Sequence, residues 1–213
     1  TLIFGEGFNR AMYPERFILG CKNPNDPIEE PLDLFLKSFN CPILKMSFES
    51  AELCKISINL VLISNISIAN KLAEINKSLT KLVKFVYEDK NKDTDKVKGI
   101  LQLYTKFDPN NLTENTPGGK YTAYSVNKGE QLALCLRNVP DNTFIDNNTI
   151  YFVAIHELAH IMTDEIGHTP KFWSNMKYLL HKAHEIGVYN PVDYKKKPVD
   201  YCGQEINSTP YGF

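Results

Sequence analysis

The chain has 213 residues, of which 43% are hydrophobic, and this is enough to bury one core. Its formal net charge of −1 argues against a nucleic-acid partner, because such proteins usually carry a strong basic excess. The longest apolar stretch is interrupted by Lys55, Asn59 and Asn65, so no membrane span is expected.

The first 45 residues are expected to form an extended arm. They carry scattered glycine, proline and asparagine with aromatic residues between them, and residues 31–39 alone have the apolar spacing of a short amphipathic helix. Such an arm packs on its own domain or docks on a partner protein. Residues 46–213 are then expected to form one domain. The sequence begins with Thr1, which leaves room for an upstream segment.

Two periodic patterns follow the arm. Residues 55–60 alternate polar and apolar side chains, which predicts a strand. Apolar residues then recur at helical spacing from Ile68 to Val86 and predict a helix over residues 67–88. A core helix is the first interpretation, and coiled-coil pairing is the alternative. A shorter helical pattern covers residues 97–104.

A β-hairpin is predicted next, because residues 121–126 and 131–137 are strand-like and a turn containing glycine joins them. The free edge of the second strand could bind an extended peptide through main-chain hydrogen bonds. An ordinary strand with a covered edge is the alternative. The predicted substrate edge consists of Gln131, Leu132, Ala133 and Leu134.

The most informative stretch is HELAH, residues 156–160, which has the HExxH pattern of a zinc-binding helix. The helix is expected over residues 149–166, with N-cap oxygens before it and Gly167 after it. Residues four apart share a helix face, so His156 and His160 can bind one ion. Glu157 lies beside that ion, where a carboxylate takes a proton from zinc-bound water and passes it to a leaving amine. The motif therefore predicts a zinc-dependent hydrolase.

A catalytic zinc ion usually has three protein ligands and an open position for water. Asp164 is excluded because its Cα lies about 12 Å along the helix axis from that of His156. It is expected to be a partner of His160 or a solvated acid. His168 is the preferred third ligand, because the glycine before it can turn the chain back toward the metal. Glu185, on the next helix, is the runner-up.

That next helix is expected to start at Thr169-Pro170 and to end near Ile186. Beyond it, the tetrapeptide Pro-Val-Asp-Tyr occurs twice, at residues 191–194 and 198–201. The hydroxyl of Tyr194 or of Tyr201 could stabilise a developing oxyanion, with packing as the alternative role for each.

The cysteines are expected to be free thiols. They are five in number, scattered along the chain, and contain no CxxC pair. Reduced cysteines fit an intracellular, reducing compartment. The five are Cys21, Cys41, Cys54, Cys135 and Cys202.

The segment HELAHIMTDEIGHTPKFW, residues 156–173, resembles the WLM and SprT-like zincin peptidases. These proteins pair HExxH with a downstream histidine that an aromatic residue follows closely, here Phe172. Residues 121–202, about the C-terminal half, are more specifically similar to metallopeptidase-like proteins of large DNA viruses. The resemblance implies zinc (Zn2+) held by His156, His160 and His168, with Glu157 as catalytic base. Seven residues separate the second and third histidines, which is more than in the WLM pattern.

These patterns predict an α+β fold. A zincin-like domain over residues 46–213 would combine a small antiparallel or mixed sheet with the HExxH helix and the helix after it. The expected activity is peptide-bond hydrolysis by zinc-bound water that Glu157 activates, on a peptide or protein substrate. The alternative is a structural component of a large DNA virus particle, such as a minor capsid protein, that retains the zinc site. In that case the arm over residues 1–45 would contact other virion proteins, and the chain would be located in the virion.

Overall fold

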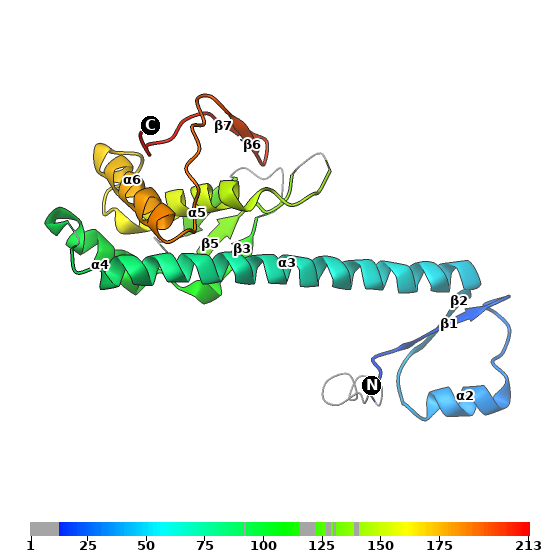
Figure 1. The fold of residues 1–213 in the computed structure, drawn as a ribbon. Helices are drawn as coiled ribbons and strands as arrows, with labels where there is room; N and C mark the ends of the chain where they lie inside the picture. Colours follow the sequence, from blue (N-terminus) through cyan, green and yellow to red (C-terminus); the bar gives the residue numbers. More distant parts are fainter. Residues whose placement is uncertain (1–12, 92, 116–121, 127–128, 130, 139–140) are drawn as a thin grey trace. The chain divides into compact units, whose positions relative to one another are not determined.

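The structure is a computed structural model that describes residues 13–213 except 92, 116–121, 127–128, 130 and 139–140. Helices and small separate sheets build the chain, in agreement with the predicted α+β class. It divides into two compact units, Thr1–Ile66 and Ser67–Phe213 (Figure 1). The division follows Ile66, whereas the sequence pattern places a boundary after residue 45.

The first unit contains two strands and a helix ahead of a longer helix. β1 (Phe17–Cys21) pairs in parallel with β2 (Ile43–Ser47), and α2 (Glu30–Lys37) connects them. α2 confirms the short helix predicted at residues 31–39. Residues 17–47 therefore contain two strands and a helix where composition suggests an extended arm, because two distant strands pair with each other. Residues 1–12 of the predicted arm lie outside the described residues.

A 41-residue helix, α3 (Phe48–Glu88), contributes to both units. The strand predicted at residues 55–60 is wrong, because the short polar–apolar alternation there is part of this helix. Its second half confirms the predicted apolar stripe. The buried residues of that stripe are Ile75, Leu79, Leu82, Val83 and Val86.

The second unit contains a three-stranded sheet in the order β3-β5-β4. β4 (Ala123–Val126) and β5 (Gln131–Leu134) are antiparallel and confirm the hairpin over the residues described. β3 (Leu112–Glu114), which follows the short helix η2 (Pro109–Asn111), pairs in parallel with β5. The free edge predicted at Gln131–Leu134 is therefore wrong, because β3 covers it and β4 lies at the edge instead.

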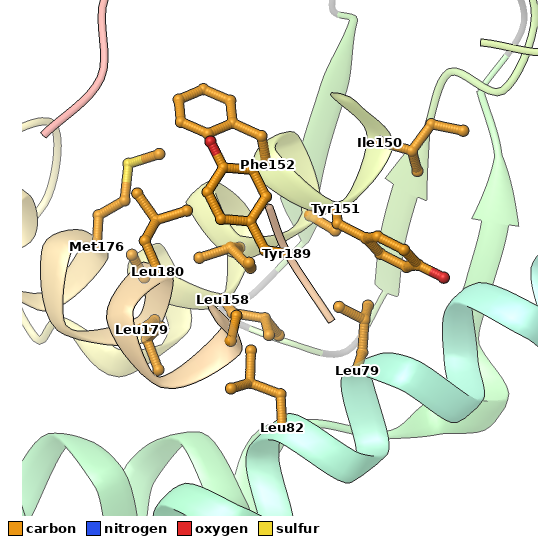
Figure 2. Close-up of a cluster of buried hydrophobic side chains, with 14 of the residues drawn as sticks. Leu79, Leu82, Ile150, Tyr151, Phe152, Leu158, Met176, Leu179, Leu180 and Tyr189 are labelled. Atoms are coloured by element: carbon orange, nitrogen blue, oxygen red, sulfur yellow. The ribbon is translucent and has the colours of Figure 1, made fainter. Parts of the chain in front are cut away.

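Helices α5 (Asn147–Met162) and α6 (Pro170–Glu185) pack on each other beside the second half of α3. Figure 2 shows side chains from the three helices and Tyr189 meeting in one apolar cluster. The Tyr151 hydroxyl lies 3.1 Å from the hydroxyl of Ser78, which satisfies a polar group beside this core. The core thus holds the HExxH helix through side chains of α3 and α6.

The C-terminal end of α5 rests against α4 (Val97–Lys106), which follows the short helix η1 (Thr94–Lys96). A Cβ on Gly99 would lie 2.6 Å from the carbonyl oxygen of Met162, so this close approach requires glycine. Gln102 donates a hydrogen bond of 2.7 Å to the carbonyl of Ile161, one of the unpaired groups of the last helical turn.

The chain ends in a two-stranded hairpin, β6 (Val199–Tyr201) and β7 (Gln204–Ile206). A disulfide joins Cys202, in its turn, to Cys135 directly after β5. The prediction that all five cysteines are free is wrong for this pair, because 67 residues separate the two and only the folded chain brings them together. Cys21, Cys41 and Cys54 are free.

Candidate metal centre

Helix α5 starts and ends through local hydrogen bonds. The carboxylate of Asp146 accepts the backbone N–H of Thr149 at 3.1 Å and forms the N-cap. The helix ends at Met162, earlier than predicted, and the hydroxyl of the buried Thr163 donates to the carbonyl of Ala159 at 2.7 Å. Asn175 of α6 donates to the same hydroxyl at 2.9 Å, so the end of α5 is tied to the next helix.

Two imidazoles of α5 and one from the loop after it lie close together. Nε2 of His160 lies 3.2 Å from Nε2 of His156 and 3.1 Å from Nε2 of His168, and the remaining pair is 3.1 Å apart. A ring nitrogen is either a donor or an acceptor, so a closed triangle of such contacts cannot consist of hydrogen bonds alone. A single ion about 2.0–2.1 Å from each nitrogen fits the triangle and leaves one side open. The donor set therefore suits zinc.

The loop between the two helices delivers the third imidazole. Gly167 does not cap α5, but its φ of +84° turns the chain immediately before His168. Thr169 then caps α6 by accepting the backbone N–H of Phe172 at 3.3 Å, with Pro170 in the first turn. The turn expected at Gly167 is thus confirmed, but it lies in the loop after α5 and not at the end of the helix.

The other candidate ligands lie outside the cluster of possible metal-binding groups found among the described residues. Glu185 forms an ion pair with Lys182 at 3.1 Å near the end of α6. Asp164 lies 2.7 Å from Lys171 and 3.3 Å from Lys98. Hydrogen bonds from these two lysines lower the pKa of Asp164 to about 2, which identifies it as an ionised surface group.

Burial prepares His156 as a ligand. The pKa of His156 falls to about 3, first because the ring is buried and then because His160 and His168 repel a positive charge. The ring is therefore neutral near pH 7, as metal coordination requires. Phe172 is fully buried, and its ring centroid lies 4.3–4.9 Å from those of all three imidazoles. Phe172 therefore packs behind the site, whereas Trp173 is 39% exposed and borders the cavity.

His156, His168 and Glu157 line a cavity of about 310 Å³. Burial raises the pKa of Glu157 to about 7, so its carboxyl group can exchange a proton near neutral pH. Ala123 of β4 lines this cavity, and no residue of β5 does. The strand edge beside the cavity is therefore that of β4. Sequence patterns did not indicate that β7 and the two residues after it form part of the cavity wall. These residues are Gln204, Glu205, Ile206, Asn207 and Ser208.

The two repeated tyrosines have different surroundings. Tyr201 lines the cavity, and its hydroxyl is buried. Burial raises its pKa, and the charge of Glu157 adds to this effect, so the hydroxyl stays protonated. Tyr194 packs against Phe152 with ring centroids 4.7 Å apart and is not one of the residues lining the cavity.

Glu157 should make the stability of the metal-free chain depend on pH. The raised pKa means that the folded chain binds more protons than the unfolded chain between pH 4.5 and about 7. The stabilising contribution is thus fully present below pH 4.5 and is lost as pH rises through 7. Glutamine cannot ionise, so the free energy of unfolding of Glu157→Gln should not show this loss. Relative to wild type, it should rise by up to about 3 kcal/mol from pH 4 to pH 8. Urea unfolding of both metal-free proteins measures this, and parallel pH profiles would contradict it.

Comparison with known proteins places this site within a family. Residues 83–210, more than half of the chain, match the WLM domain. Uncharacterized protein R325 of Acanthamoeba polyphaga mimivirus is 34% identical over 139 residues, which are 65% of this chain and 71% of that protein. Uncharacterized protein 136R of Invertebrate iridescent virus 6 is 37% identical over 82 residues, 38% of this chain and 44% of that protein. Uncharacterized protein 042R of Invertebrate iridescent virus 3 is 38% identical over 82 residues, 38% of this chain and 48% of that protein.

The chain therefore spans less than half of each iridescent virus relative. No solved structure matches it. The match to the WLM domain covers α5, α6 and the loop between them, and so includes HELAH and His168. The chain belongs to the WLM domain family, which is metallopeptidase-like, and has relatives among large DNA viruses.

Proposed function

We propose that this protein is a zinc-dependent peptidase with a zincin-like domain. One observation carries the proposal: three imidazole nitrogens form a triangle, and two of these histidines, His156 and His168, line the same cavity as Glu157. When bound there, zinc supplies a Lewis acid that polarises a peptide carbonyl and acidifies a water molecule. The three histidines would hold it as neutral ligands.

Glu157 has the chemistry of the general base and acid. As a carboxylate it accepts the proton of the attacking water, and as a carboxylic acid it returns that proton to the leaving amine. A pKa near 7 makes both forms accessible at neutral pH. Tyr201 lines the same cavity, and we infer that its protonated hydroxyl turns toward a developing oxyanion and donates a hydrogen bond to it.

An extended peptide is the substrate that fits the cavity. Its wall includes Ala123, in the edge strand β4, whose main-chain groups can pair with a peptide strand. Apolar side chains form much of the remaining wall, which favours an apolar substrate side chain next to the cleaved bond. These are Phe152, Val153, Trp173, Met176 and Ile206.

Removal and return of zinc tests the proposal. The zinc-loaded chain should cleave a peptide library, a chelator should abolish cleavage, and added zinc should restore it. Zinc binds the folded chain and not the unfolded chain. With free zinc at about 1,000 times its Kd, the loaded chain should therefore have a free energy of unfolding about 4 kcal/mol higher than the zinc-free chain. Mass spectrometry of the peptides and thermal unfolding measure the two effects. Cleavage that survives chelation would overturn the proposal.

The same experiment separates the alternative, a structural virion component. Its expected result is a loss of thermal stability on zinc removal without cleavage of any peptide by the loaded chain. Contacts of residues 1–45 with other virion proteins and an intracellular or virion location remain predictions.

A further inference from the structure

The first half of α3 presents apolar side chains to solvent on every side. Eight large aliphatic residues between positions 53 and 66 are each 48–64% exposed. At 3.6 residues per turn, Leu53, Ile56, Leu60 and Ile63 follow one face, and Ile58, Val61 and Leu62 follow the opposite face. A soluble helix normally confines such residues to one stripe. This segment therefore requires a cover around its whole circumference.

The length of the segment points to the nature of that cover. Residues 53–70 contain a single charged residue, Lys55, and none of the 18 is fully buried by the described chain. Ile68, near the end of the segment, is partly buried against the core of the second unit. An α-helix of 18 residues is about 27 Å long, which is close to the ~30 Å hydrocarbon thickness of a bilayer. Charged residues flank both ends. They are Glu49 and Glu52 before it, and Lys71, Glu74 and Lys77 after it.

Two other kinds of helix have the same length and apolarity, and neither fits. The core helix of a soluble protein is mostly buried, whereas no residue of this segment is. A leader sequence is not preceded by folded chain, whereas the paired strands β1 and β2 precede this helix. A single partner helix would cover one stripe of roughly 100° and leave the opposite face in water.

We propose that residues 53–70 of α3 lie in the hydrocarbon core of a lipid bilayer. The interruption by Lys55, Asn59 and Asn65, which argues against a span in the sequence, is compatible with this location. Lys55 lies two residues from the start, where its stem can extend to the headgroups. Asparagine side chains in membranes hydrogen-bond to neighbouring helices or backbone. The proposal is independent of the peptidase proposal, because it rests on residues outside the metal centre.

Flotation of the full chain with phosphatidylcholine vesicles tests the proposal. Wild type should float with the vesicles and resist extraction at alkaline pH. Leu60→Asp with Ile63→Asp places two acids near the segment centre and should lower the ratio of bound to free chain by on the order of a hundredfold or more. The matched control, Ala73→Asp with Lys84→Asp, changes two exposed residues of the same helix beyond the segment and should float like wild type.

Every outcome decides the question. Zinc content and the circular dichroism of all variants show that loss of flotation is not loss of folding. Equal flotation of the two double variants would overturn the proposal. A wild-type chain that stays in the aqueous phase would also overturn the proposal. This holds for a monomer and for a defined oligomer that the double variant Leu60→Asp with Ile63→Asp dissociates. The oligomer would assign the segment to contacts between copies of this chain.

Discussion

Glu157→Gln is expected to keep one zinc ion per chain and to lose peptide hydrolysis by a factor of about 10²–10⁴. The side chain of Glu157 is buried and lines the cavity with His156 and His168. It does not belong to the cluster of three histidines that would hold the metal. Glutamine has nearly the same shape but cannot accept the proton of an attacking water. Metal analysis and steady-state kinetics on the same preparations measure the two properties separately.

Glu205→Gln is the matched control, because Glu205 is an exposed carboxylate that lines the same cavity. It should retain both zinc and turnover. His156→Ala should lose both, since it removes one of the three nitrogens. Turnover by Glu157→Gln at the wild-type rate would contradict the role assigned to this carboxylate, even if zinc binding were confirmed.

Loss of the Cys135–Cys202 disulfide is expected to lower the free energy of unfolding by about 2–4 kcal/mol. The bond links two positions 67 residues apart, so its removal enlarges the conformational freedom of the unfolded chain. In the folded chain it ties the β6–β7 turn to the end of β5, and the residues after that turn form one wall of the cavity. Peptide hydrolysis should therefore fall together with stability.

Urea unfolding of Cys135→Ser with Cys202→Ser measures the change, and a dithiol reductant should bring wild type to the same midpoint. Cys21→Ser with Cys41→Ser is the control, because these cysteines are free. An unchanged midpoint for reduced wild type would show that the bond does not contribute to stability.

Local patterns predicted much of the second unit. The HELAH helix, the cap at Thr169 and the helix after it depend on residues a few positions apart, and the structure contains each of them. The turn at Gly167 is also local, because glycine adopts a positive φ without strain. This turn predicts His168 as the third ligand, and His168 lies beside the other two imidazoles.

Short or ambiguous patterns failed where distant residues decide the outcome. The alternation at residues 55–60 suits a strand, but the residues on both sides continue a helix and include it. β3 has three residues, too few for a recognisable pattern, yet its pairing with β5 moves the open edge to β4. The expectation of free cysteines likewise rested on spacing, which carries no information about which side chains meet.

The sequence by itself determined the chemistry of the site: two histidines on one helix face, a carboxylate beside them, and a third histidine after a glycine. These features follow from helix geometry and from the conformational freedom of one residue, so they need no knowledge of distant contacts. The tertiary structure alone decided which strand edge borders the cavity, that the hairpin of β6 and β7 forms part of its wall, and that Cys135 meets Cys202. Those features depend on packing between segments far apart in the chain, where many arrangements of the same local elements compete.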